Sequence, residues 1–331
     1  MSPPESALSV ANLTIRIRRH HASPITVVDD VTWSVAAGGR LGIVGESGSG
    51  KTMTTLAVLG LLPRAAEMTA GTIRLDGREL NGMSQRQIRG LRGKKIAMVP
   101  QDPFSSLDPS FSVGDQLAEP LRLHRGLRAG ELEETSVEAL ARVRISEPRA
   151  RLRQYSHQLS GGIRQRVVSA IALAGEPSVL IADEPTTALD VTTQAQYLQL
   201  LRDLQSQTGF ALVLISHDLL LVQSMCDQVV VMYAGQVVES GSLGEVFGNP
   251  RHPYTRALIG AIPMLRPDHR LESIEGMPPG PDDDVQGCRF APRCKFARSV
   301  CHSTPPALTT TDGSQRAARC WGTEPQGWIT T

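Results

Sequence analysis

A glycine-rich loop between a strand-like and a helix-like segment constrains this chain more than any other feature. Residues 40–44 (RLGIV) predict a short buried strand, and residues 53–62 (MTTLAVLGLL) predict a helix. The intervening GESGSGKT fits G-x-x-x-x-G-K-[ST], in which backbone N–H groups cradle phosphates at a helix N-terminus. The sequence therefore predicts an α/β fold with a nucleotide-binding loop made of Gly45, Glu46, Ser47, Gly48, Ser49, Gly50, Lys51 and Thr52.

An acidic pair follows a second apolar run. Residues 179–185 (VLIADEP) predict a buried strand that delivers Asp183 and Glu184 at its C-terminal edge, where open α/β sheets bind ligands. Asp183 would hold the shell of a magnesium ion, together with the hydroxyl of Thr52, and Glu184 would polarise an attacking water. Lys51 would reach the outer phosphates. Taken alone, the acidic pair would also suit a strand end in solvent.

The segment LSGGIRQR (159–166) predicts a second anion site. A helical run follows it, so Ser160, Gly161 and Gly162 would lie at a helix N-terminus, where backbone amides and the helix dipole attract negative charge. An ordinary helix cap is the alternative for this segment by itself. A helix over 191–207 and a strand over 211–216, which is followed by His217, complete the α/β pattern.

Other segments predict a β-layer and a helical insertion. Residues 71–80 (GTIRLDGREL) alternate around Asp76-Gly77, which predicts antiparallel strands joined by a tight turn, and residues 94–99 predict another strand. Residues 113–155 have helical spacing and are interrupted at Pro120 and Pro148. They predict a group of helices inserted into the α/β core.

Composition excludes several classes of protein. The 34 basic and 33 acidic residues nearly cancel, so no nucleic acid is expected as a partner. The first residues do not resemble a secretory signal, and no apolar run approaches the roughly 18 residues of a membrane span. We therefore expect a cytosolic chain with reduced thiols, and a length of 331 residues suggests a main domain with an appendage.

The motifs together resemble those of ABC-type ATPases, over roughly residues 8–265. They occur in family order: the phosphate loop, the Q-loop glutamine Gln101, the signature LSGG, the VLIADE strand, the D-loop ending at Asp190, and the switch histidine His217. The resemblance implies a P-loop NTPase (RecA-like) core, an antiparallel β subdomain and a helical subdomain at about residues 104–158. It also implies ATP and Mg²⁺ as cofactors, Gln101 as a further magnesium ligand, and Glu184, His217 and Gln101 as catalytic residues.

The same resemblance implies that two cassettes pack head to tail. Ser160, Gly161, Gly162 and Asp190 of one cassette would then act on the ATP bound by the other. Phosphate chemistry favours this arrangement, because one γ-phosphate needs donors on most sides and one loop supplies mainly one hemisphere. The chain departs from the family at Ile17, where an aromatic residue usually stacks on adenine; His20 or His21 could substitute.

The segment NPRHPYTRALIGAIP (249–263) predicts a turn and a short amphipathic helix. It also resembles a hallmark of the ATPase subunits of oligopeptide, dipeptide and nickel importers. This implies residues 1–250 as the cassette and 251–331 as an importer-type extension, on the cytoplasmic face of the inner membrane. The implied partners are a related second ATPase subunit, two permease subunits and an extracytoplasmic solute-binding protein. A nickel importer, an exporter, a soluble ABC ATPase and a regulatory nucleotide binder are the alternatives.

Four of the five cysteines lie in the last 44 residues, at Cys288, Cys294, Cys301 and Cys320. Their gaps fit neither a zinc ribbon nor a common ferredoxin run, but four thiolates are the ligand count of an iron–sulfur cluster. The pattern C-x-F-x-x-R-C-x-x-A at 288–297 resembles the extension of some peptide-importer ATPases, for which a 4Fe-4S cluster is implied. Zinc and free or oxidised thiols are the alternatives. Cys226 reads as a buried apolar residue.

Overall fold

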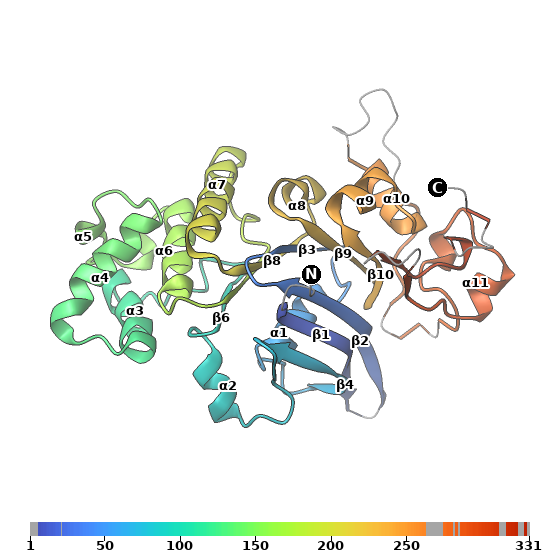
Figure 1. Cartoon of the computed structure of the whole chain (residues 1–331), viewed down its shortest axis with the longest axis horizontal. Helices are drawn as coiled ribbons and strands as arrows, with labels where there is room; N and C mark the ends of the chain where they lie inside the picture. The colour runs from blue at the N-terminus through green and yellow to red at the C-terminus, as the bar shows by residue number, and fades with distance from the viewer. Residues whose placement is uncertain are drawn as a thin grey trace, which may run out of the picture. The chain divides into compact units, whose positions relative to one another are not determined.

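The computed structural model describes residues 6–20, 22–262, 274–280, 282–283, 285–310, 316–323 and 328–329 (Figure 1). The chain divides into two compact units, each built from segments that are distant in sequence. The signature unit comprises residues 1–8, 35–40 and 75–215, and the loop unit comprises residues 9–34, 41–74 and 216–331. Over the described part of the chain, no helix is both long enough and apolar enough to cross a membrane.

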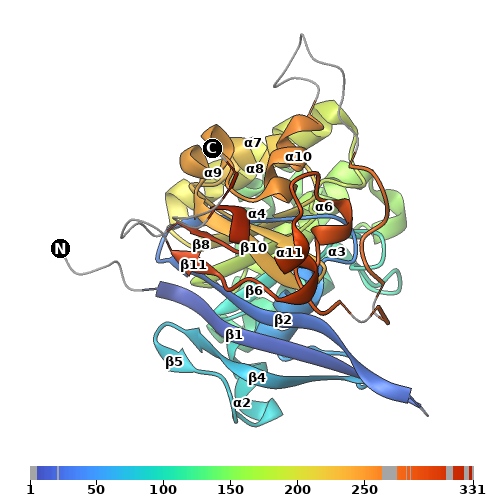
Figure 2. The same ribbon diagram turned by 90° about the vertical axis from the view of Figure 1, so that its right-hand side faces the viewer.

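Three long strands form a β-layer in the loop unit. β1 (Ser6–Arg19), β2 (Ala22–Ala36) and β4 (Ala66–Leu75) lie in the order β2-β1-β4 (Figure 2). Along β1 the apolar side chains of Leu13 and Ile15 are fully buried, as the two-residue period of a half-buried strand requires. After β4, Asp76 and Gly77 have φ angles of 48° and 75° and precede β5 (Arg78–Glu79), which confirms the predicted tight turn.

A second group of strands in the loop unit carries the phosphate loop. β3 (Arg40–Val44) pairs in parallel with β9 (Gln228–Tyr233), and β9 pairs antiparallel with β10 (Gln236–Ser242). α1 (Lys51–Val58) begins directly after the glycine loop, so the predicted strand, loop and helix are confirmed. The other helices of this group are α8 (Leu219–Met225), α9 (Leu243–Gly248) and α10 (Pro253–Gly260).

The cysteine-bearing tail, which we define as residues 287–323, extends the same group of strands. β12 (Ala317–Ala318) pairs antiparallel with β10, and β11 (Thr309–Thr310) pairs with β12. The remaining elements of the tail are short: 3₁₀ turns over Ala291–Arg293 and Trp321–Thr323, and α11 (Ser299–Ser303). Because such short elements bury little apolar surface of their own, the tail depends on contacts with its neighbours.

Parallel strands form the centre of the signature unit. β8 (Ala211–Ser216), β7 (Val179–Asp183) and β6 (Ile96–Val99) pair in this order, with Val179 opposite both Ile96 and Ala211. Every residue of β7 is buried, as expected for a parallel strand covered on both faces. α6 (Gly161–Leu173) packs against β6 and against α7 (Val191–Thr208). The strands and helices predicted for this unit are confirmed.

A chain of short helices precedes α6, as the sequence predicts. It consists of α3 (Val113–Pro120), a π-helical turn (Leu121–Arg125), α4 (Ala129–Arg142), α5 (Pro148–Arg151) and a 3₁₀ turn (Ser156–Gln158). Both prolines lie at boundaries between helical elements, as predicted. Pro120 is the last residue of α3, which passes directly into the π-helical turn, and Pro148 occupies the first turn of α5, where no donor is needed. A further short helix, α2 (Gln85–Leu91), lies before β6.

Candidate functional site

The phosphate loop has a backbone that only glycine can adopt at two positions. Gly45 has a φ of 153°, and a Cβ atom there would lie 2.1 Å from the carbonyl oxygen of Met232. Gly50 has a φ of 95°, and its Cβ would lie 3.0 Å from the carbonyl oxygen of Val27. The loop is therefore packed against neighbouring backbone. The loop turns at the start of α1, which leaves the first N–H groups of the helix at the tip of the loop.

Lys51 lies inside this loop with only 5% of its surface exposed. Its Nζ donates to the carbonyl oxygens of Gly45 at 2.7 Å and Glu46 at 2.9 Å. A buried ammonium requires oxygen partners, and phosphate oxygens satisfy the same requirement. Thr52, the next residue, is exposed in the first turn of α1. The geometry suits the phosphate-binding role predicted for Lys51.

Two residues that the sequence did not single out hold Glu46 of the loop. The N–H of Glu46 donates to the hydroxyl of Tyr254 at 3.0 Å, and its carboxylate accepts from Nη1 of Arg293 at 3.0 Å. Tyr254 comes from α10 and Arg293 from the cysteine-bearing tail. The HPYT segment was the available signal for Tyr254, but its pattern predicted only a turn and a helix. Arg293 is the fixed arginine of the pattern C-x-F-x-x-R-C-x-x-A, but that pattern was interpreted only through its cysteines.

The acidic pair lies in the signature unit, at the end of β7. Asp183 is 2% exposed, and the next residue, Glu184, has a positive φ of 44°. Nε2 of Gln101 donates to Oε2 of Glu184 at 3.0 Å, and the hydroxyl of Thr187 donates to the same oxygen at 3.2 Å. The structure thus brings Gln101 and Glu184 together.

The signature residues lie at the start of α6. Ser160 is the exposed N-cap of this helix, and its hydroxyl makes no capping hydrogen bond. A Cβ on Gly162 would lie 2.7 Å from Cγ2 of Thr193, so glycine permits the close approach of α7. Ser160, Gly161, Gly162 and Asp190 line one cavity of about 450 Å³.

Asp190 is the N-cap of α7. Its carboxylate accepts from the backbone N–H of Thr193 at 3.0 Å and from the Thr193 hydroxyl at 2.7 Å. Both hydrogen bonds stabilise the ionised carboxylate and so lower the pKa of Asp190, and the bond from the backbone N–H of Thr193 has the larger effect. The D-loop residue predicted beside the signature is therefore anionic at ordinary pH and lies in the same cavity.

The remaining nucleotide-site predictions fall in the loop unit. His217 is exposed between β8 and α8, where Asp218 caps the helix by accepting from Leu220 N–H at 2.9 Å. Ile17 lies in β1 and His20 in the turn after it, whereas His21 lies outside the described residues. Lys51, Thr52 and His217 belong to the loop unit, and Gln101, the acidic pair and the signature belong to the signature unit.

The four clustered cysteines line one small cavity of the loop unit (Cys288, Cys294, Cys301 and Cys320). Burial raises the pKa of Cys288 and of Cys294 to about 11, with smaller contributions from the neighbouring thiols, and burial also raises the pKa of Cys320. Within the described ranges, no three His, Cys, Asp or Glu side chains form a group that could hold a metal ion. The expected 4Fe-4S cluster is therefore not confirmed. Cys226 is buried as predicted.

His252 is a further residue of the cysteine cavity that the sequence did not predict. It caps α10, its Nδ1 accepts from the N–H of Tyr254 at 3.1 Å, and burial lowers its pKa to about 3. Its Nε2 is buried and has no hydrogen-bond partner among the described residues. Because Nδ1 accepts, the proton of this neutral imidazole is assigned to Nε2, which makes that atom a donor.

Two family profiles match the chain. The profile described as "ABC transporter" matches residues 28–187, and the profile described as "Oligopeptide/dipeptide transporter, C-terminal region" matches residues 238–301. The first match includes the phosphate loop, the signature and the acidic pair. The second includes Tyr254 and three of the four clustered cysteines.

Curated relatives match almost from end to end. The chain is 47% identical over 314 residues to a "Putative peptide import ATP-binding protein" of Brucella abortus (strain 2308), which covers 95% of this chain and 94% of the relative. It is 44% identical over 310 residues to the dipeptide transport ATP-binding protein DppD of Escherichia coli (strain K12), with 93% and 94% covered. The dimeric post-hydrolysis structure of the ATP-binding cassette MJ0796 with ADP and Pi has a TM-score of 0.64 and 27% identity, covering 71% of this chain and 98% of that one.

Proposed function

Because the chain belongs to the ABC transporter family of ATP-binding proteins, we propose that it is the ATP-hydrolysing subunit of a peptide importer. The observation that carries this proposal is the presence of both profiles in one chain, the ABC transporter profile and the oligopeptide/dipeptide C-terminal profile. The names of the Brucella and Escherichia relatives support peptide import in particular. The fold is that of an ABC ATPase, and ATP hydrolysis follows from membership of the family.

In this proposal each nucleotide motif has its own role in the chemistry of ATP. Lys51 and the loop amides bind the phosphates, and Thr52, Asp183 and Gln101 would hold a magnesium ion, which supplies positive charge for the transition state. Glu184 holds the attacking water and takes its proton, and Gln101 orients Glu184 by the hydrogen bond between them. His217 acts at the γ-phosphate as the switch residue.

A second cassette completes each site. Ser160, Gly161 and Gly162 at the start of α6 supply donors to the ATP that the other cassette binds, and Asp190 lies at the same interface. Closing the two cassettes excludes water, which strengthens every electrostatic contact. Hydrolysis removes the γ-phosphate that both cassettes hold. The bound nucleotide then no longer stabilises the closed state over the open one, so the cassettes separate.

The opening would drive solute uptake through separate membrane proteins. The proposed partners are a related second ATPase subunit, two permease subunits and an extracytoplasmic solute-binding protein, with this chain on the cytoplasmic face of the inner membrane. Residues 104–158 and the loop after Gln101 would face the permease. Residues 1–250 form the cassette in this proposal, and residues 251–331 form its extension.

Reconstitution tests the proposed function directly. The chain would be co-purified with a permease pair, a second ATPase subunit and a binding protein, and placed in vesicles. We expect ATP-dependent accumulation of a labelled dipeptide that stops when the binding protein is left out. Accumulation of nickel alone would indicate the alternative solute, and movement only in the outward direction would contradict import.

We also propose that the four clustered cysteines hold an iron–sulfur cluster. Support comes from the four thiols on one cavity and from the Nε2–H of His252, a buried donor on the same cavity. When bound, a cluster would cross-link the short elements of the tail, which have little core of their own.

Replacing Cys294 with Ser is expected to remove most of the iron bound by the chain. The protein would be purified without oxygen and analysed for iron, acid-labile sulfide and zinc, and its visible absorbance would be recorded. Cys226→Ser is the matched control, because Cys226 is buried outside the cavity and should leave iron unchanged. A colourless wild-type protein with zinc or no metal would contradict the cluster.

A further inference from the structure

We propose that the cysteine-bearing tail positions the phosphate loop, with Arg293 as the positioning residue, so that the affinity for ATP depends on the tail. The inference rests on the proposed binding of ATP by this loop. It assigns a role in nucleotide binding to a segment that lies outside all the nucleotide-binding motifs.

Arg293 makes a direct contact between the tail and the loop. Its side chain is 6% exposed, and Nη1 lies 3.0 Å from Oε2 of Glu46 and 3.1 Å from the hydroxyl of Tyr233. The other guanidinium nitrogens donate to backbone carbonyl oxygens, Nε to Glu275 at 3.0 Å and Nη2 to Ile274 at 3.3 Å. A guanidinium bound on this many sides has one orientation, so it fixes the Glu46 carboxylate in turn.

An aromatic cluster supports the same end of the loop. The ring centroids of Tyr233 and Tyr254 are 4.6 Å apart, and the ring of Phe290 lies 5.2 Å from the first and 5.5 Å from the second. Tyr254 is fully buried and accepts from the N–H of Glu46. The backbone of Glu46 is therefore held by Tyr254, against which Phe290 of the tail packs, and its side chain is held by Arg293 of the tail itself.

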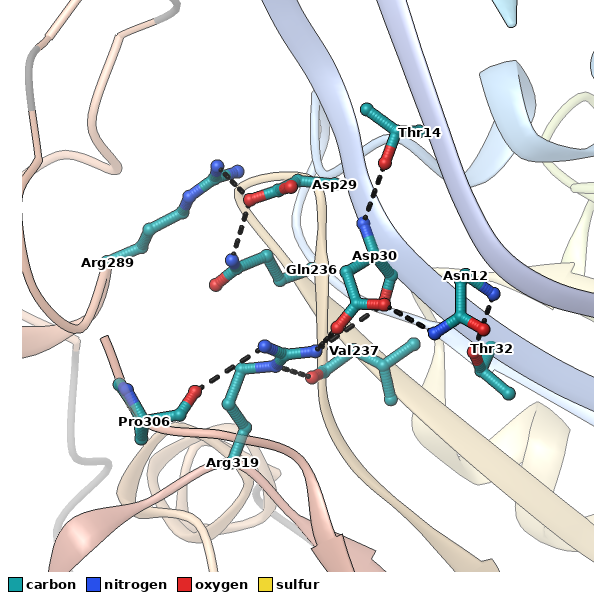
Figure 3. A network of polar contacts seen from close by, with 10 residues as sticks. All are labelled: Asn12, Thr14, Asp29, Asp30, Thr32, Gln236, Val237, Arg289, Pro306 and Arg319. Atoms are coloured by element: carbon teal, nitrogen blue, oxygen red, sulfur yellow. Dashed lines mark hydrogen bonds and ion pairs between the residues drawn. The ribbon is translucent and has the colours of Figure 1, made fainter. Parts of the chain in front are cut away.

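A second path reaches the other end of the loop through the β-layer. Nη2 of Arg289 lies 2.7 Å from Oδ2 of Asp29, and Nη1 donates to the carbonyl oxygen of Ala234. The N–H of Asp29 donates to the carbonyl oxygen of Gly235 at 2.8 Å. The N–H of Gly235 donates in turn to the carbonyl oxygen of Ser49 at 3.0 Å. Figure 3 shows Arg289 and the amide of Gln236 meeting at Asp29.

Arg319 anchors the tail beside this path. Its Nη2 lies 3.0 Å from Oδ2 of Asp30, and its Nε donates to the carbonyl oxygen of Val237 on β10 at 3.0 Å. Figure 3 shows this guanidinium between Asp30, Val237 and Pro306. The side chain is 8% exposed, so the ion pair with Asp30 is shielded from solvent on one side. The tail is thus fixed to the β-layer at two consecutive acids, Asp29 and Asp30.

These contacts bear on ATP binding because the loop conformation is costly. Gly45, Gly48 and Gly50 all have positive φ angles, and a glycine-rich segment loses much conformational freedom when it is ordered. A loop already held at Glu46 and Ser49 has less entropy to lose when phosphates bind. The tail therefore contributes to affinity by preorganisation, without touching the nucleotide.

Replacing Arg293 with Gln tests the inference in the full chain. We expect the Kd for MgATP, measured by calorimetric titration, to rise about tenfold, because a charge-assisted contact to the loop is lost. Arg293→Lys retains the charge but not the fork of donors, and should give an intermediate Kd. Amide hydrogen exchange should become faster at residues 45–50 in the Gln variant and stay unchanged along β7.

The matched control is Arg298→Gln. Arg298 belongs to the same tail, but its guanidinium lies 4.3 Å from the ring centroid of Trp328, and the Kd should not change. If Arg293→Gln does not fold, Glu46→Gln removes the same ion pair from the partly exposed partner, and amide exchange at residues 45–50 should become faster in the same way.

A folded Arg293 or Glu46 variant with wild-type Kd and wild-type amide exchange at residues 45–50 would overturn the inference but not the proposed function. A wild-type chain that fails to bind MgATP would overturn the proposed function together with it.

Discussion

Replacing Glu184 with Gln is expected to lower the steady-state ATPase rate of the assembled transporter by at least about a hundredfold, the lower range for the loss of a general base. Glutamine retains the size of the side chain and can still hydrogen-bond to Gln101, but it cannot take a proton from water. The Kd for MgATP should stay within about twofold of the wild type, since no phosphate contact is removed. Cassettes with bound ATP should accumulate in the closed, associated state, measured by light scattering.

The matched control for this variant is Glu176→Gln. Glu176 belongs to the same unit, and its side chain makes an exposed ion pair with Arg125 at 3.5 Å, so its loss should leave the rate unchanged. A Glu184→Gln complex that hydrolyses ATP at the wild-type rate would remove Glu184 as the base.

Replacing Lys51 with Ala should weaken MgATP binding by about a hundredfold or more, and hydrolysis should fall with it. The phosphates lose a positive charge that is held inside the loop at 5% exposure, and charge-assisted bonds in such surroundings are strong. The loop carbonyl oxygens of Gly45 and Glu46 lose their donor as well. The expected result is a Kd beyond the range of calorimetric titration at the concentrations that saturate the wild type.

Lys95→Ala is the control for charge removal. The Lys95 side chain is about half exposed and pairs with Asp76 at 3.6 Å, outside the loop, so its loss should not alter the Kd. Unfolding of Lys51→Ala would be recognised by circular dichroism. A folded Lys51→Ala chain with wild-type affinity for MgATP would contradict the assignment of the loop.

The nucleotide motifs could be predicted from the sequence because their signals are local. The glycines of the loop, the strand before it and the helix after it occupy 19 consecutive positions, 40–58. All three elements form in the predicted order, but the helix spans Lys51–Val58 and not residues 53–62. The cap at Ser160 and the acids at the end of β7 are likewise determined by residues next to them in the chain. The boundaries of the helical elements at Pro120 and Pro148 are likewise marked by single residues.

The support of the loop could not be predicted in this way. Arg293 and Glu46 are 247 residues apart, and Arg319 and Asp30 are 289 apart. The tail contains several arginines and the chain contains 33 acids, so composition does not say which pairs will form. His252 illustrates the same limit, because its pattern predicted a helix start but not an imidazole on the cysteine cavity. Such contacts depend on how short elements pack, and no periodicity encodes that.

The central claim is that one cassette alone contains an incomplete catalytic site. The most direct measurement is the ATPase rate per chain as a function of chain concentration, with the oligomeric state followed by analytical ultracentrifugation at each point. The account predicts that the rate per chain rises with the fraction of dimer and approaches zero in dilute, monomeric solution. A constant rate per chain across the transition, in verified monomer and dimer alike, would contradict it.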